Sequence, residues 1–146
     1  IIMSLGMYSG KIGNSFVSKK NYPVEATEWI LQNLDVKNMK LFNEYNYGSY
    51  LLYKGVPVFI DSRADLYAPE FNGKRAENGE YDGRDIFTDF IKTSSMERYY
   101  EDTFEKYDIT HIILKKKSKL NTFISNDSGF LEMYNDDNFV VYERCK

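Results

Sequence analysis

The sequence predicts an α/β fold, a three-layer sandwich whose mostly parallel sheet ends in an antiparallel C-terminal hairpin. Segments with apolar residues at helical spacing alternate with short, continuously apolar runs that are typical of buried strands. The last two apolar runs flank a polar turn, which is typical of a hairpin. We therefore expect a single α/β domain over residues 22–146, preceded by an irregular lead or linker over residues 1–21.

The first half of this domain is expected to contain two helices and two strands. Apolar residues at helical spacing predict a helix over residues 23–34, and the short apolar segment Met39–Glu44 predicts a strand. A brief helix over Tyr47–Tyr53 follows. The run Val56–Ile60 is predicted to be a second buried strand, with Pro57 at its start or at a bulge, because proline cannot donate to a strand ladder.

The second half begins with the polar segment Ala68–Asp85, which is the longest predicted loop. Two amphipathic helices, a buried strand, a short helix and a hairpin are expected after it. In chain order these are the helical stripes Ile86–Ile91 and Tyr99–Tyr107, the strand His111–Leu114, the helix Leu120–Ile124 and the hairpin strands Phe130–Tyr134 and Phe139–Tyr142.

Charge and hydropathy exclude several classes of protein. The chain of 146 residues has a net charge of −3 and a pI near 5.3, so no electrostatic footprint for nucleic acid is present and no nucleic-acid partner is expected. No apolar run reaches the ~18 residues of a membrane span, and no signal peptide is recognisable. Because the first residue is Ile1 instead of Met, we expect the chain to be part of a longer protein.

Metal and cofactor sites lack support in the sequence. With one histidine, His111, and one cysteine, Cys145, a zinc site is not expected, and neither residue is expected to be catalytic. The segment Asn78–Asp89 imitates the carboxylate spacing of a calcium loop but ends in Asp where the bidentate Glu is needed. No nucleotide-binding motif occurs. The basic segment Lys115–Lys119 is interpreted as a solvated loop, with attraction to an anionic membrane surface as the alternative.

Two polar segments, Asn43–Gly48 and Asp61–Tyr67, follow the first two predicted strands. Neighbouring parallel strands end at the same edge of a sheet, and ligands of open α/β sheets bind outside that edge. This geometry predicts a shared site, which Tyr45 and Tyr67 complete from the same segments. The candidate ligand-binding residues are Asn43, Tyr45, Asn46, Asp61, Arg63, Asp65 and Tyr67. The alternative is that Asp61 and Arg63 form a structural ion pair.

Three segments also resemble a known family. Tyr22–Ala26 (YPVEA), Leu41–Leu51 (LFNEYNYGSYL) and Phe59–Tyr67 (FIDSRADLY) are similar to a pattern in the C-terminal extracytoplasmic domain of bacterial multi-pass membrane proteins. Those proteins are related to the dolichyl-phosphate-mannose-type (GT-C) glycosyltransferases. The similarity covers about Asn21 to Lys146, and this chain departs from it at Tyr47, where Trp is commoner, and at Ser49 and Ser62, where Gly is usual.

The resemblance implies an outward-facing domain on the extracytoplasmic face of the bacterial cell membrane, attached to a membrane-embedded remainder of the same chain. The family uses a polyprenyl-phosphate sugar donor, and its catalytic carboxylate lies between early membrane helices, so this chain would contain no catalytic residue. Its expected role is to bind acceptor or glycan, or to support the membrane part, without a cofactor.

Two other functions remain open at this stage. One is a free-standing α/β enzyme that uses Asp61 or Asp65 as general base and Arg63 as an anion clamp. The other is an interaction module without a small-molecule site. A fully buried Asp61–Arg63 pair would favour the interaction module, whereas exposure of both residues at a concave cleft would count against it.

Overall fold

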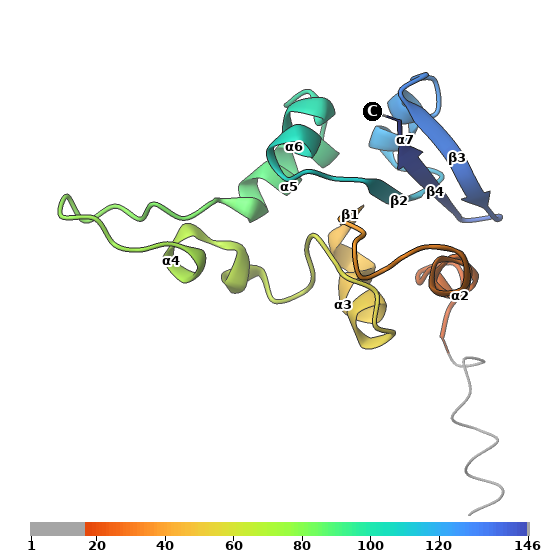
Figure 1. Cartoon of the computed structure of the whole chain (residues 1–146), viewed down its shortest axis with the longest axis horizontal. Helices are drawn as coiled ribbons and strands as arrows, with labels where there is room; N and C mark the ends of the chain where they lie inside the picture. The colour runs from red at the N-terminus through yellow and green to blue at the C-terminus, as the bar shows by residue number, and fades with distance from the viewer. Residues whose placement is uncertain (1–16, 146) are drawn as a thin grey trace, which may run out of the picture.

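The computed structural model describes residues 17–145, so most of the predicted lead lies outside the described residues (Figure 1). Helices and short strands alternate along the chain. The elements are α2 (Val24–Asn33), β1 (Leu41–Asn43), α3 (Tyr45–Tyr53), the 3-10 helix η2 (Ala64–Tyr67), α4 (Pro69–Asn72), α5 (Ile86–Ser94), α6 (Tyr100–Lys106), β2 (His111–Lys115), α7 (Lys119–Ile124), β3 (Phe130–Asn135) and β4 (Phe139–Arg144).

The sheet has four strands in the order β1-β2-β4-β3, and it is mostly antiparallel. β1 pairs with β2 in parallel, with Phe42 opposite Ile112, whereas β4 runs antiparallel to both β2 and β3. The prediction of a mostly parallel sheet is therefore wrong. The C-terminal hairpin is confirmed, but its last strand lies inside the sheet, and β3 forms the edge.

The segment Val56–Ile60, predicted to be the second buried strand, is not a strand. Val56 and Ile60 are nevertheless fully buried. A continuous apolar run signals burial, and burial is compatible with an irregular segment if its main-chain groups find other partners. Here the side chain of Asn43 is the partner of two of these main-chain groups.

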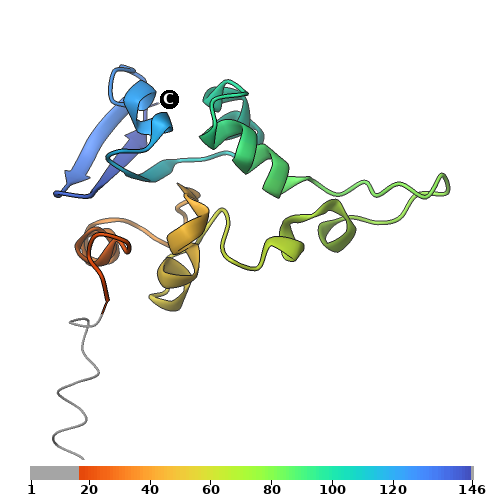
Figure 2. The same ribbon diagram turned by 180° about the vertical axis from the view of Figure 1, so that it is seen from behind.

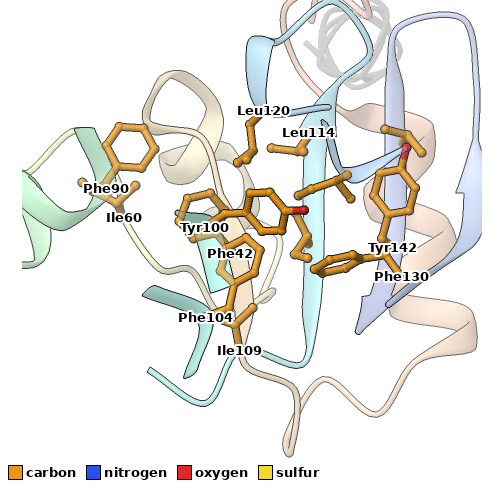
Figure 3. Packing of buried hydrophobic residues seen from close by; sticks show 13 residues of the cluster. Phe42, Ile60, Phe90, Tyr100, Phe104, Ile109, Leu114, Leu120, Phe130 and Tyr142 are labelled. Carbon is orange, nitrogen blue, oxygen red and sulfur yellow. The ribbon is translucent and has the colours of Figure 1, made fainter. Parts of the chain in front are cut away.

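Both faces of the sheet carry a hydrophobic cluster, because neighbouring residues of a strand point to opposite faces. Phe42 and Ile112 face the cluster that contains residues of α5, α6 and α7, whereas Leu41 and Ile113 face the cluster that contains residues of α2 and α3. Figure 3 shows the first cluster, where the ring centroids of Phe42 and Phe104 lie 5.1 Å apart in an edge-on arrangement. The aromatic residues therefore supply much of the core on this face.

The chain between α3 and α5 forms an arm that extends away from the sheet (Figures 1 and 2). This arm contains η2 and α4, so the predicted loop Ala68–Asp85 includes a short helix. Asn72 connects the two sides of the arm: its Nδ2 donates to the carbonyl oxygen of Arg84 at 2.7 Å, and its Oδ1 accepts the N–H of Arg84 at 2.6 Å. α5 then begins beyond Asp85, whose carboxylate accepts the N–H of Thr88.

Candidate functional site

Asn43, the last residue of β1, is fully buried and holds the Val56–Ile60 segment in place. Its Oδ1 accepts the N–H of Phe59 at 2.8 Å, and its Nδ2 donates to the carbonyl oxygen of Ile60 at 2.8 Å. The same Nδ2 lies 3.0 Å from the carbonyl oxygen of Glu44. One amide side chain thus replaces part of the strand ladder that the sequence predicted here.

Gly48 allows α3 to approach this segment closely. A Cβ atom at position 48 would lie 2.0 Å from the carbonyl oxygen of Ile60 and 2.9 Å from the Cα of Asp61. Such distances are far inside van der Waals contact and involve main-chain atoms, which cannot rotate away. The two polar segments therefore meet at a point where only glycine fits.

Asp61 and Arg63 form an ion pair in which the carboxylate is buried and the guanidinium is not. The exposed fraction of the side chain is 0% for Asp61 and 56% for Arg63. Arg63 Nε lies 3.0 Å from Oδ1 and Nη2 lies 2.5 Å from Oδ2, and the main-chain N–H of Arg63 also donates to Oδ1 at 2.9 Å. This fork fixes the orientation of the guanidinium.

The pKa of the Asp61 carboxyl lies below its usual range. The hydrogen bonds from Arg63 are the main cause, and a hydrogen bond from Tyr67 contributes in the same direction against the opposing effect of burial. Asp61 is consequently an anion at neutral pH whose oxygens already have donors. A general base needs a free lone pair and a pKa closer to 7, so this geometry does not suit Asp61 for that role.

The two predicted tyrosines lie at the same place. The Tyr45 hydroxyl donates to the carbonyl oxygen of Ser62 at 3.1 Å, and its ring packs edge-on against Phe87. Tyr67 is half-buried and packs against the hydrophobic cluster that contains Phe42. Both rings thus support the segment that carries Arg63.

Asn46 and Asp65, the two remaining predicted site residues, are exposed. The structure therefore brings the two polar segments together, as the sequence predicted, and it divides the candidate residues into two groups. Asn43 and Asp61 are buried, whereas Asn46, Arg63 and Asp65 reach the surface.

Two serines at this junction were not among the predicted residues. Ser49 Oγ on α3 lies 2.7 Å from Ser62 Oγ, and both residues are exposed. These are the two positions at which the sequence departs from the glycines usual in the family that it resembles. The paired departure was the available signal, because a contact between two serine hydroxyls is possible only where both glycines are replaced.

Glu44, which follows β1, is a partly buried carboxyl that the sequence did not single out as a site residue. Its Oε2 accepts the hydroxyl of Tyr47 at 3.0 Å and the main-chain N–H of Lys115 at 2.9 Å. Burial raises the pKa of Glu44 despite these hydrogen bonds. Glu44 therefore ties the first turn of α3 to the end of β2.

No three His, Cys, Asp or Glu side chains among residues 17–145 are grouped so that they could hold a metal ion. His111 Nδ1 lies 2.9 Å from the hydroxyl of Thr110, and burial lowers the pKa of His111. Cys145 is exposed and unpaired. Over the same range, none of the helices has both the length and the apolar character needed to cross a membrane.

Comparisons with known proteins identify a structural likeness. The chain superposes on the crystal structure of the C-terminal globular domain of an oligosaccharyltransferase from Archaeoglobus fulgidus with a TM-score of 0.55 and 13% sequence identity. The match covers 83% of this chain and 95% of that one. No protein-family model and no curated protein matches the sequence. At this level of identity the likeness shows that the two domains share a fold.

Proposed function

We propose that this chain is the non-catalytic extracytoplasmic domain of a bacterial membrane protein of the glycosyltransferase type, and that it binds acceptor or glycan. The observation that carries the proposal is the fold likeness to the C-terminal globular domain of an oligosaccharyltransferase, which extends over 83% of this chain and 95% of that one. The motifs quoted above, which resemble the extracytoplasmic domain of GT-C-related proteins, support the same assignment. The membrane-embedded remainder of the chain would be its partner, and a glycan or polyprenyl-phosphate sugar its ligand.

The exposed guanidinium of Arg63 is the proposed contact residue. Asp61 accepts hydrogen bonds from Nε and Nη2, which holds the guanidinium in one orientation while more than half of the side chain stays exposed to a ligand. A donor fixed in this way loses little side-chain entropy on binding. Asn46, Asp65 and the hydroxyls of Ser49 and Ser62 add further polar groups at the surface of the same junction, where sugar hydroxyls find both donors and acceptors.

Asn43 and Asp61 have a different role in this proposal. Both are fully buried, and their polar atoms have partners within the protein. They position the main chain and the guanidinium and do not touch the ligand. The ligand-binding set from the sequence thus becomes a contact group and a supporting group.

An interaction module without a small-molecule site is the second candidate. The observation that favours it is the burial of the Asp61 carboxylate. A buried carboxylate that already accepts hydrogen bonds from Arg63 contributes mainly to the stability of the fold. Arg63 itself is more than half exposed, which distinguishes the arrangement from a fully buried pair. A free-standing enzyme receives less support, because Asp61 is unsuited to act as a base and only the exposed Asp65 is left for that role.

The membrane context is tested by fractionation of the native gene product. An antibody raised against this chain should detect a band far heavier than 17.2 kDa in the membrane fraction. A band near 17 kDa in the soluble fraction would contradict the proposed attachment to a membrane portion.

Ligand binding is tested by NMR titration of the chain with soluble oligosaccharides and short acceptor peptides. The proposal expects shifts of the Arg63 Nε–H resonance and of the amides of Ser49 and Ser62. Arg63→Lys, which keeps the charge but loses the fork, should weaken binding in protein that remains folded. Exposed Lys74→Gln on the arm is the matched control and should leave binding unchanged. If none of these resonances shifts at saturating ligand concentrations, the result would favour the interaction module.

A further inference from the structure

A cavity of about 360 Å³ lies at the carboxyl end of β2, and lysines form most of its lining. Lys115, Lys116 and Lys117 come from the end of β2 and the turn after it, Lys20 comes from the chain before α2, and Asp137 and Asn138 come from the turn between β3 and β4. The sequence predicted a solvated loop at Lys115–Lys119. Only the fold brings the fourth lysine from the other end of the described chain.

The main chain around this cavity is fixed by hydrogen bonds between its turns. The N–H of Lys116 donates to the carbonyl oxygen of Asn138 at 2.9 Å, and Asn121 Nδ2 donates to the carbonyl oxygen of Lys116 at 3.0 Å. Asp136 Oδ1 accepts the N–H groups of Asn138 and Phe139, each at 2.8 Å. The two turns that carry Lys116 and Asn138 are therefore held together by their main chain.

The four lysines form no salt bridge among residues 17–145, although the Glu44 carboxyl interacts electrostatically with Lys115. None of them has a described Asp or Glu oxygen within 4.0 Å, whereas Lys19 pairs with Glu25 at 2.6 Å and Lys40 with Asp108 at 3.2 Å. Asp137 is the single acidic residue of the lining, so four positive charges and one negative charge leave +3 on the cavity. The whole chain, by contrast, has a net charge of −3.

We propose that this cavity binds a phosphate-bearing anion with at least two negative charges, such as a pyrophosphate group. Lysine ammonium groups act as compact point charges that suit phosphate oxygens without demanding the planar geometry of a carboxylate–arginine pair. The volume falls within the range of about 300–1,000 Å³ that is usual for small-molecule sites. The anion comes from a soluble compound or from a lipid headgroup, and the chemistry of recognition is the same for both.

The first test is calorimetric titration of the full chain with inorganic pyrophosphate at low salt. The variant Lys116→Gln/Lys117→Gln should weaken binding by about fivefold for each lysine removed, the size of effect usual for a lysine near a phosphate-rich surface. Asp137→Asn should tighten it, because the opposing charge is lost. Lys37→Gln/Lys74→Gln removes the same charge from exposed lysines elsewhere and should leave the affinity unchanged.

The second test separates the two sources of the anion. Phosphatidylcholine vesicles with and without phosphatidic acid are sedimented with the wild-type chain and with each double variant. Binding of free pyrophosphate that is lost in Lys116→Gln/Lys117→Gln supports a soluble ligand, and binding of acidic vesicles that is lost in the same variant supports a headgroup. The proposal is overturned if neither probe binds, or if the control double variant loses as much affinity. Such a failure would not affect the proposed role of Arg63, whose test uses uncharged glycans and peptides.

Discussion

The side chain of Asn43 and the main chain of Ile60 are joined by a hydrogen bond of 2.8 Å from Nδ2 to the carbonyl oxygen, and both residues are fully buried. Through this bond and the one from Phe59 N–H, the end of β1 holds a segment that pairs with no strand. The junction of the two polar segments depends on this contact. Asn43 is therefore a supporting residue of the candidate site.

Replacement of Asn43 by Ala should destabilise the fold strongly. The N–H of Phe59 and the carbonyl of Ile60 would both lose a partner in a buried place, and each unsatisfied group costs roughly 1–3 kcal/mol. We expect a loss of about 2–4 kcal/mol in the free energy of unfolding, measured by urea denaturation. Exposed Asn46→Ala should change it by less than about 0.5 kcal/mol. Equal effects of the two variants would show that the buried amide has no special role.

Gly48→Ala should also destabilise the protein, against the trend for helices. Within α3 an alanine would by propensity alone stabilise the helix by up to about 1 kcal/mol. The new Cβ would however lie 2.0 Å from the carbonyl oxygen of Ile60, and overpacking of this kind costs typically about 1–3 kcal/mol or more. The sign of the change in unfolding free energy thus decides between the two effects. Ser49→Ala, on the same helix but exposed, is the matched control and should have a small effect.

Asp61 should make stability fall in acid. Because Arg63 lowers the pKa of this carboxyl, the native state holds the proton less tightly than the unfolded chain, whose Asp pKa is about 3.9. The stabilisation is complete above that value and disappears as the pH falls through the lower, folded pKa. Urea denaturation from about pH 5 down to about pH 2 should show a shallower loss for Asp61→Asn than for the wild type.

The control for this pH series is Asp65→Asn, which removes an exposed carboxylate four positions away. Its curve should run parallel to that of the wild type. If Asp61→Asn also runs parallel, the ion pair with Arg63 does not contribute to acid sensitivity.

Glu44 should produce the opposite pH dependence. Burial raises its pKa, so the native state binds the proton more tightly than the unfolded chain, whose Glu pKa is about 4.3. Its contribution to stability is greatest below that value and decreases as the pH rises through the folded pKa. Glu44→Gln keeps an acceptor for the N–H of Lys115 and removes this decrease. The variant should therefore be more stable, relative to the wild type, at pH 7 than at pH 4.

Exposed Glu77→Gln on the arm provides the comparison for Glu44. It should show no change in relative stability between the two pH values. A relative stability of Glu44→Gln that is the same at pH 4 and pH 7 would contradict a raised pKa for this carboxyl.

Local patterns predicted most of the elements correctly. The helix expected over residues 23–34 is α2 at Val24–Asn33, and the strand expected at His111–Leu114 is β2 at His111–Lys115. These patterns succeed because the alternation of apolar residues records which face of an element is buried. The meeting of the segments that begin at Asn43 and Asp61 was also predictable, although the reason given, two adjacent parallel strands, was wrong.

The error at Val56–Ile60 has a physical cause. An apolar run shows that a segment is buried but not where its main-chain hydrogen bonds go. The partner was the side chain of Asn43, which the sequence presented only as one polar residue among several. The antiparallel placement of β4 beside β2 could not be predicted from local patterns for a similar reason. Strand order depends on contacts between segments that are far apart in the chain.

The sequence by itself determined most of the helices, the C-terminal hairpin and the polar character of the two segments, because these depend on the residue types within a few positions of each other. The tertiary structure alone decided that Asp61 is buried while Arg63 is exposed, and that Lys20 joins Lys115–Lys117 around one cavity. Burial and the gathering of charge arise from contacts between distant segments. Local periodicity does not encode such contacts.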